Sequence, residues 1–265
     1  MKPQHDAKIA RVNRAVWDRW SDGYQSKHGE FLTGRNAEAW GLWRRPESEL
    51  RILDRVRERE VLELGCGAAA WSRSLARRGA RVTAVDISSR QIFHALRRCA
   101  AEEAAHISFL VANAEHLPFR DGAFDVVFSD YGALSWADPY LTVPEISRVL
   151  RLGGQLAFCT NSPFFALCWD PDARTLRPEL RHEYFGLHTR QVGQGAVDYV
   201  LPYGEWIRLF HAYGMSVEAL IEEPPVPGST TTFTDRPAEW TGRWPLESIW
   251  SVRKVSDPGS GSPAQ

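Results

Sequence analysis

The sequence has few cysteines, no excess of either charge and no long apolar run. Its four cysteines, Cys66, Cys99, Cys159 and Cys168, include no Cys-x-x-Cys pair and have no histidines at metal-ligand spacing, so we expect reduced thiols and no metal site. A formal net charge of −1 provides no basic field that would concentrate nucleic acid or an anionic membrane. No apolar segment is long enough to span a bilayer, and no secretory leader is expected. These absences favour a cytoplasmic protein whose partner is a small molecule.

A short apolar run leads directly into two closely spaced glycines at Val61–Ala70, which reads Val-Leu-Glu-Leu-Gly-Cys-Gly-Ala-Ala-Ala. Gly65 and Gly67 can adopt positive φ and have no Cβ, so a ligand can approach their backbone closely. The helical pattern of Trp71–Arg78 follows at once. A strand, a glycine turn and a helix N-terminus in this order are typical of nucleotide binding in a doubly wound sheet.

The second predicted strand, Arg81–Val85, ends in an acidic residue. The carboxylate of Asp86 can accept hydrogen bonds from both hydroxyls of a ribose. The glycine spacing by itself also fits a dinucleotide fingerprint, which leaves two cofactor classes open. Glu63, two residues before the first glycine, would repel a pyrophosphate and attract an ammonium group. This acidic residue therefore favours a cofactor that carries an ammonium group.

These motifs resemble those of the class I S-adenosylmethionine-dependent methyltransferases, whose first motif reads acid-x-Gly-x-Gly-x-Gly. This chain has Ala69 at the third glycine position. Asn113–Phe119, Asn-Ala-Glu-His-Leu-Pro-Phe, resembles the family segment Asp-Ala-Glu-x-Leu-Pro-Phe that closes over the adenine. Val143–Gly154 is similar to the family run Glu-x-x-Arg-Val-Leu-Arg-Pro-Gly-Gly. The resemblance covers Val61–Thr160 without a gap.

The resemblance implies an S-adenosylmethionine site. The Asn113 amide oxygen would accept from the adenine amino group, and the Ala114 N–H would serve the adenine ring. Tyr24 and the turn Trp40–Trp43 would contact the methionine end of the cofactor or pack in the core. The complete expected set of cofactor-binding residues is Tyr24, Trp40, Trp43, Glu63, Gly65, Cys66, Gly67, Asp86, Ile87, Gln91, Asn113, Ala114, Glu115 and Ser129.

The acceptor is expected at the end of the fourth strand, where the sequence reads Ser129-Asp130-Tyr131-Gly132. The Asn/Asp-Pro-Pro-Tyr/Phe tetrad of methyltransferases that modify adenine or a glutamine amide is absent, which argues against those acceptors. Asp130 and Tyr131 are candidate catalytic residues that would orient or deprotonate an acceptor hydroxyl, and His182 is a third candidate from a later segment. Alternatively, Asp130 caps a turn and Tyr131 lines the cofactor pocket.

The resemblance also implies an α/β fold with a doubly wound, seven-stranded and mostly parallel sheet of order 3-2-1-4-5-7-6, whose last strand is antiparallel. The expected parts are an N-terminal helical cap over 1–58, a Rossmann-like cofactor-binding core over 59–160, an acceptor-site lid over 161–202, the C-terminal part of the sheet over 203–255 and a disordered tail over 256–265.

Several local expectations refine this plan. Apolar spacing predicts a helix over 7–20, with irregular chain over 21–34, and further helices starting at 36 and covering 47–57. Ser88 is expected to cap the next helix, in a capping box with Gln91. The Pro-, Thr- and Gly-rich stretch 223–245 could fold over the lid or over a neighbouring subunit.

The expected activity is transfer of a methyl group from S-adenosylmethionine to a small, fairly apolar acceptor, most readily at oxygen, because aromatic residues are frequent in the cap and lid segments. Two alternatives stay open. An NAD-dependent oxidoreductase could use the same glycine cradle, and a non-catalytic protein could bind S-adenosylmethionine without turnover. No nucleic-acid or membrane partner is expected, and a homodimer is left open.

Overall fold

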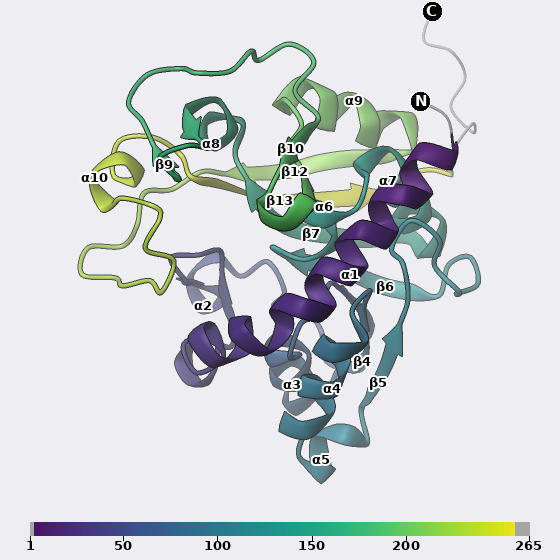
Figure 1. The fold of residues 1–265 in the computed structure, drawn as a ribbon. Helices are drawn as coiled ribbons and strands as arrows, with labels where there is room; N and C mark the ends of the chain where they lie inside the picture. Colours follow the sequence, from purple (N-terminus) through teal and green to yellow (C-terminus); the bar gives the residue numbers. More distant parts are fainter. Residues whose placement is uncertain (1–2, 258–265) are drawn as a thin grey trace, which may run out of the picture.

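A seven-stranded sheet forms the centre of the molecule in the computed structural model, which describes residues 3–257 (Figure 1). The strands in chain order are β3 (Glu60–Leu64), β4 (Arg81–Asp86), β5 (Ile107–Val111), β6 (Phe124–Asp130), β7 (Leu150–Asn161), β12 (Met215–Ile221) and β13 (Glu247–Lys254). Across the sheet they are ordered β5-β4-β3-β6-β7-β13-β12, and β13 is antiparallel to both its neighbours. The predicted order and the antiparallel last strand are confirmed.

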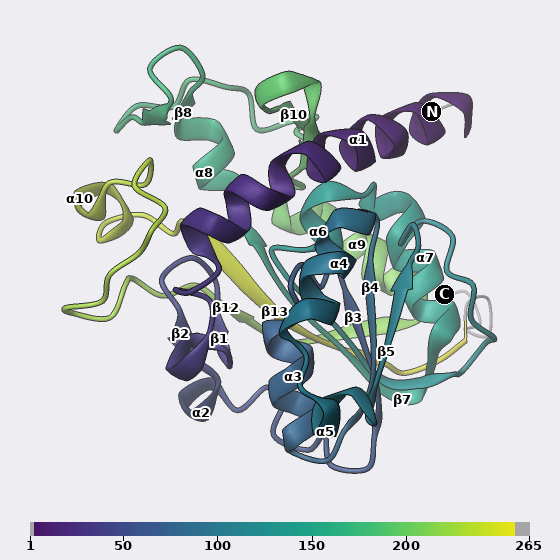
Figure 2. The same cartoon turned by 60° about the horizontal axis from the view of Figure 1, so that its bottom comes forward.

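Helices cover both faces of this sheet. They are α3 (Ala70–Arg77), α4 (Ser89–Arg98), α5 (Ala101–Ala104), α6 (Ala133–Trp136), α7 (Pro139–Val149) and α9 (Tyr203–Ala212). Figure 2 shows α3 and α4 on the near side of the strands. Their apolar side chains belong to one buried layer, and those of α7 and α9 belong to the other.

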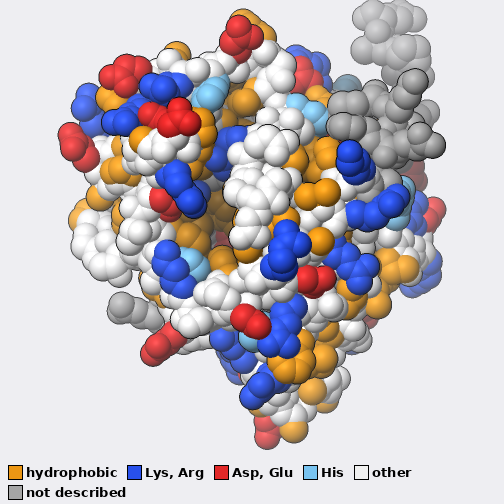
Figure 3. All heavy atoms as spheres, in the orientation of Figure 1, with side chains coloured by type: hydrophobic (Ala, Val, Ile, Leu, Met, Phe, Trp, Pro, Cys, Tyr) orange, Lys and Arg blue, Asp and Glu red, His pale blue; other side chains and the backbone are white. Residues whose placement is uncertain are grey.

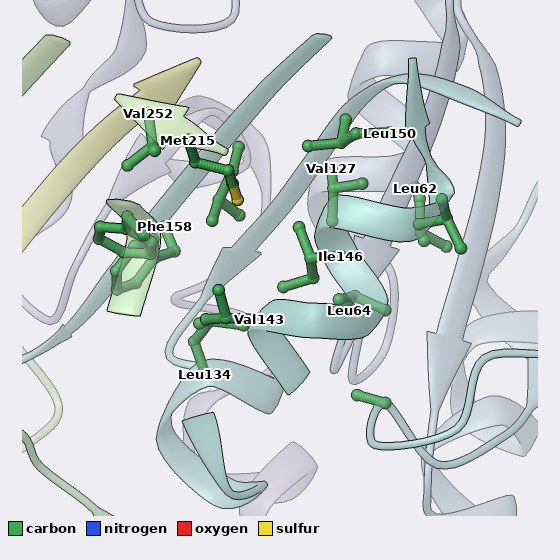
Figure 4. Packing of buried hydrophobic residues seen from close by; sticks show 14 of the residues in the cluster. Leu62, Leu64, Val127, Leu134, Val143, Ile146, Leu150, Phe158, Met215 and Val252 are labelled. Atoms are coloured by element: carbon green, nitrogen blue, oxygen red, sulfur yellow. The ribbon is translucent and has the colours of Figure 1, made fainter. Parts of the chain in front are cut away.

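The central strands are buried on both faces because successive side chains alternate between the two apolar layers. Leu62 and Val127 belong to the layer that contains α7, where Ile146 lies close to them (Figure 4). Val61 and Phe128 belong to the layer that contains α3 and α4. This double burial explains why these strands read as nearly continuous apolar runs in the sequence.

The first helix is longer than the sequence predicted. α1 spans Pro3–His28, so the expectation of irregular chain from 21 onward is wrong for its first eight residues. Gly23 lowers helix propensity, but contacts with α4 hold this half of the helix. Gln25, for example, donates a hydrogen bond to the Gln91 side chain at 2.9 Å. Tertiary contacts therefore decide the length of α1.

The segment that links α1 to the sheet is mostly not helical, and the predicted helices from 36 and over 47–57 are wrong. It contains η1 (Gly34–Asn36), the hairpin β1 (Ala39–Trp40) and β2 (Arg45–Pro46), and the single turn α2 (Glu47–Leu50). Arg51 adopts φ +55° and ends α2. The buried Glu47 carboxylate accepts hydrogen bonds from the Trp40 indole at 2.7 Å and from the Leu53 N–H, which fixes a compact loop instead.

The lid region is folded and packs against a segment far along the chain. Its elements are α8 (Pro163–Cys168), β8 (Trp169–Asp170), β9 (Thr175–Leu176), β10 (Thr189–Gln191), η2 (Gly193–Gly195) and β11 (Val197–Tyr199). Phe165 and Leu176 form a small apolar cluster with Trp240 of α10 (Ala238–Thr241). Part of the stretch 223–245 thus folds onto the lid, as one of the two expected arrangements has it. Most of the predicted tail, residues 258–265, lies outside the described residues.

Candidate cofactor and acceptor site

An open cleft with a volume of about 1200 Å³, its mouth included, lies at the carboxyl ends of β3, β4 and β6. The strand order reverses between β3 and β6, and doubly wound sheets bind ligands at such a switch point. α1 and the segment around Phe233 complete the wall. In the space-filling view the surface is hollowed left of centre, and hydrophobic side chains lie inside the hollow (Figure 3).

The switch point is closely packed because two glycines face each other there. A Cβ on Gly65 would lie 2.5 Å from the Cα of Gly132, and a Cβ on Gly132 would lie 2.7 Å from the carbonyl oxygen of Gly65. Gly65 also has φ +77°, which an L side chain rarely adopts. Ala69 at the third glycine position adopts φ +57°, at a cost of roughly 1–2 kcal/mol relative to the right-handed conformation, so the glycine turn is kept.

Asp86 is held by two backbone donors at the end of β4. Its carboxylate oxygens accept hydrogen bonds from the Gly67 N–H at 2.9 Å and from the Ser88 N–H at 2.8 Å. Burial raises the pKa of Asp86 to about 6. Each carboxylate oxygen has a second lone pair, so Asp86 can still accept from a ribose diol in the cleft.

The helix after Asp86 begins as predicted, but the capping box is incomplete. The Ser88 side chain accepts from the Gln91 N–H at 3.2 Å, which confirms the cap. The Gln91 side chain accepts from Gln25 of α1 instead of turning back to Ser88. Gln91 and Ile87 both line the cleft.

Asn113, Ala114 and Glu115 line the cleft in the segment after β5. The Asn113 side-chain oxygen accepts from the Glu115 N–H at 3.1 Å, and its amide donates to the Glu115 carboxylate at 3.2 Å. Glu115 also accepts from the Asp138 N–H at 3.0 Å. The oxygen of Asn113 is therefore partly used within the loop, and its contact with an adenine stays a prediction.

Glu63 and Cys66 line the cleft at the end of β3. The Glu63 carboxylate accepts from the Ser72 N–H at 3.1 Å and from the Ser72 hydroxyl. Burial, reinforced by the negative charges of Asp130 and Asp86, raises the pKa of Glu63 to about 8. A positively charged ligand would favour the ionised form of this carboxyl group.

Asp130 accepts three hydrogen bonds at the end of β6. It accepts from the Gly41 N–H at 2.9 Å, from the Arg44 guanidinium at 2.9 Å and from the Trp71 indole at 3.2 Å. The ion pair is buried, since the side chains of Arg44 and Asp130 are 7% and 6% exposed. This geometry favours a positioning role over proton transfer, although the predicted catalytic role is not tested by it.

Tyr131 lines the cleft next to Asp130, in a left-handed conformation with φ +51°. Its hydroxyl is buried and has no hydrogen-bond partner within the described residues. Burial and the nearby Glu247 carboxyl group raise the pKa of Tyr131 well above its usual range. Glu247 accepts from the Leu42 N–H at 2.9 Å, and burial raises its own pKa to about 7. The hydroxyl thus points into the protein, and it is the rest of Tyr131 that borders the cleft.

Four predicted site residues do not form part of the cleft wall. Trp40 is fully buried in the apolar layer of α3, and Trp43 packs beside the lid cluster. The Ser129 hydroxyl donates to the Leu64 carbonyl at 2.8 Å, so it joins β6 to β3. His182 is exposed and contacts the Trp169 carbonyl at 2.8 Å. The other predicted residues, Tyr24 included, line the cleft.

The cleft has a polar half and an apolar half, and sequence reasoning missed most of the second. The polar half contains the glycine turn, Asp86 and the Asn113 segment. The apolar half is lined by Ala10, Trp17, Tyr24, Leu32, Leu42, Trp136, Ala137 and Phe233. Arg44 was also missed, although it directly follows the Trp40–Trp43 turn that drew attention to this segment. No local sequence pattern marks Trp17, Trp136 and Phe233 as neighbours, because they come from three distant segments.

Two absences concern the described residues alone. Within residues 3–257, no group of His, Cys, Asp and Glu side chains is arranged to hold a metal ion. The same part of the chain contains no helix with the length and apolar character that a bilayer crossing requires.

Solved structures with the same architecture define the fold class. An S-adenosylmethionine-dependent methyltransferase from Mesorhizobium loti superposes with a TM-score of 0.64 at 22% identity, over 78% of this chain and 95% of that one. Together with the sheet order, this likeness shows that the chain has the class I S-adenosylmethionine-dependent methyltransferase fold.

The sequence comparisons find similar proteins over part of the chain. Residues 62–158 match the family model of the methyltransferase domain. A demethylmenaquinone methyltransferase from Clavibacter sepedonicus is 30% identical over 148 residues, 56% of this chain and 57% of that protein. A malonyl-[acyl-carrier protein] O-methyltransferase from Hamiltonella defensa is 33% identical over 112 residues, 42% of this chain and 41% of that protein. Residues 62–158 are therefore similar to a methyltransferase domain, and the chain spans 57% and 41% of the lengths of these two relatives.

The residues of the polar half fit S-adenosylmethionine. A Cβ on Gly67 would meet only the Gln91 side chain, at 3.8 Å, so the backbone is open to the cleft at this point. Asp86 presents a fixed acceptor for a diol, and Glu63 presents a buried acid that a cationic group would stabilise as its anion. A diol and a positive charge are both features of this cofactor.

Proposed function

We propose that this protein transfers the methyl group of S-adenosylmethionine to a small, fairly apolar acceptor, at an oxygen atom in the first instance. The observation that carries the proposal is the two-part cleft, whose polar half fits the cofactor and whose apolar half adjoins the end of β6. An O-methyltransferase among the relatives supports oxygen as the accepting atom. The remaining part of the proposal, a cytoplasmic protein acting on a free small molecule, stays a prediction from the sequence.

The residues of this chain would hold the cofactor and the acceptor in place and shield them from water. S-adenosylmethionine supplies a methyl group that is already activated by a sulfonium. Asp86 would fix the ribose, and Glu63 would complement the positive charge. The walls of α1 and of the segment around Phe233 would exclude water and hold the acceptor in line, which is the main requirement of such a displacement. Asp130 would act indirectly, by fixing Gly41 and Arg44.

The two alternatives receive less support. The matched domain and the fold are those of methyltransferases, and Glu63 at the end of β3 disfavours an NAD pyrophosphate. A protein that only binds S-adenosylmethionine would need no acceptor site, whereas this cleft is also lined by aromatic side chains from three distant segments, Trp17, Trp136 and Phe233. Both observations favour an enzyme with an acceptor site.

The test is calorimetric titration with S-adenosylmethionine, S-adenosylhomocysteine and NAD, followed by transfer of a labelled methyl group to a panel of phenols, carboxylic acids and amines. We expect the two sulfur compounds to bind and NAD not to bind. Asp86→Ala should weaken binding by at least roughly 100-fold, because a buried hydrogen-bonded carboxylate is lost. Glu102→Ala, which removes an exposed carboxylate of α5, is the matched control. Binding of NAD alone would refute the proposal.

A further inference from the structure

Four aromatic rings form a continuous wall at the apolar end of the cleft. Trp17 lies edge-on to Trp136, with ring centroids 5.1 Å apart and an interplanar angle of 88°, and edge-on to Tyr24 at 5.5 Å. Tyr24 in turn lies 6.4 Å from Phe233. All four rings line the cleft, so the wall presents ring faces and edges to whatever occupies it.

This wall is fixed in place by contacts from outside the cleft. Its members come from α1, from α6 and from the segment before α10. Phe233 stacks on His28 at 4.3 Å with nearly parallel planes, and the His28 ring contacts the Thr232 hydroxyl at 2.7 Å. The rings of Trp17 and Trp136 are also backed by Trp20, which itself does not line the cleft. The wall is therefore preformed.

The four rings of this wall carry no charge. The charges of Arg44 and Asp130 compensate each other in a buried ion pair. Burial lowers the pKa of His28 to about 4, so this ring is neutral at physiological pH. Ala10, Leu32, Leu42 and Ala137 also line the cleft, and so does Arg98, which donates to the Gln25 side-chain oxygen at 2.6 Å. An ionised acceptor would lose its hydration against the rings of the wall.

The Tyr24 hydroxyl is the polar group of this wall that lies near the polar half. Tyr24 lines the cleft, and the charges of Arg44 and Asp130 act on it. Burial raises the pKa of Tyr24 to about 12, so the hydroxyl keeps its proton and can donate a hydrogen bond. The Tyr24 hydroxyl therefore favours a ligand with an oxygen atom that can accept its hydrogen bond.

We propose that the acceptor is a planar, uncharged aromatic ring that carries a hydroxyl or carbonyl oxygen, and that Tyr24 positions this oxygen. This proposal rests on the methyl transfer proposed above, because it assumes that the cleft binds a methyl acceptor. It differs from the sequence-based expectation, in which Tyr24 contacts the methionine end of the cofactor or packs in the core. An aromatic wall binds aromatic ligands preferentially, because edge-to-face and offset ring contacts add to the free energy gained by burying apolar area.

The experiment measures binding to the protein saturated with S-adenosylhomocysteine. Three compounds with one carbon skeleton are titrated: 2-naphthol, decahydro-2-naphthol and 2-naphthoate. We expect 2-naphthol to bind roughly ten-fold tighter than its saturated analogue, and the anion to bind most weakly. Trp17→Leu should remove most of the preference for the flat ring. Trp20→Leu, a change of the same kind on the same helix, should keep it.

Tyr24→Phe separates the two assignments of this residue. If Tyr24 positions the acceptor oxygen, the variant binds 2-naphthol several-fold more weakly, and its affinity for naphthalene and for S-adenosylhomocysteine is unchanged. A loss of S-adenosylhomocysteine affinity with unchanged 2-naphthol binding would refute this part of the proposal.

The outcomes distinguish this proposal from the function on which it rests. Equal binding of the flat and saturated alcohols, or binding of none of the three compounds to the cofactor-loaded protein, would overturn the aromatic acceptor and leave methyl transfer standing. Failure of S-adenosylhomocysteine to bind at all would overturn the proposed function and this inference with it.

Discussion

At the scale of single residues, Asp130 has structural partners besides its predicted catalytic role. It is the last residue of β6, where catalytic groups are expected, and its oxygens accept hydrogen bonds from Gly41, Arg44 and Trp71. Asp130→Ala would leave the buried Arg44 guanidinium without a counter-ion, which typically costs about 3–5 kcal/mol. We therefore expect a melting temperature lower by roughly 6 °C or more in a thermal denaturation experiment.

A matched control uses an ion pair on the surface. The side chains of Arg51 and Asp54 pair at 2.6 Å but are 71% and 38% exposed. Asp54→Ala should change stability by at most about 1 kcal/mol, since water screens such pairs. If Asp130→Ala kept its melting temperature and its affinity for S-adenosylhomocysteine but lost turnover, Asp130 would be the proton acceptor that the sequence predicted.

At the scale of elements, α1 depends on one buried amide that no sequence pattern marks. The Asn13 side chain donates to the Trp136 carbonyl at 2.7 Å and to the Val197 carbonyl at 2.8 Å, and accepts from the Val197 N–H at 2.9 Å. It thus joins α1 to α6 and β11 across the cleft wall. Asn13→Ala would leave these backbone groups unpaired, at about 1–3 kcal/mol.

Hydrogen exchange gives the readout for this element. The amide of Val197 should exchange faster in Asn13→Ala, because it loses its acceptor, and the first half of α1 should lose protection with it. Arg14→Ala, an exposed neighbour on the same helix, should leave both unchanged. Unaltered exchange at Val197 in Asn13→Ala would show that the wall is held by its aromatic contacts alone.

At the scale of the whole molecule, buried acids make stability depend on pH. Burial raises the pKa values of Glu63, Asp86 and Glu247 to about 8, 6 and 7. In the unfolded chain these groups ionise near pH 4. The folded state therefore binds more protons between about pH 4 and pH 8, so these groups make stability fall as pH rises through this range. His28 acts in the opposite sense below about pH 6.5, because its folded pKa is about 4.

We expect the ligand-free protein to melt at a lower temperature at pH 8.5 than at pH 6.5, where His28 contributes little. S-adenosylmethionine should reduce this difference, because its positive charge favours the ionised form of Glu63. The measurement is a set of thermal melts at both pH values with and without ligand. A melting temperature that rises from pH 6.5 to pH 8.5 without ligand would contradict the assigned pKa directions.

The sequence by itself determined the sheet and the glycine cradle. The strand order is the one that the resemblance of Val61–Thr160 to the methyltransferase family implies, and the structure has this order. The positions of Gly65, Gly67 and Asp86 follow from the same local pattern. These features depend on residues that are near one another in the chain, so a linear reading finds them.

Only the tertiary structure decided what surrounds the acceptor. Phe233 meets His28, Asn13 meets Val197 and Arg44 meets Asp130, over separations that no periodicity or motif spans. The same holds for the length of α1, which continues through Gly23 because α4 binds it. Such contacts exist only after the sheet has brought distant segments together, and their energy comes from burial and pairing that a linear pattern does not encode.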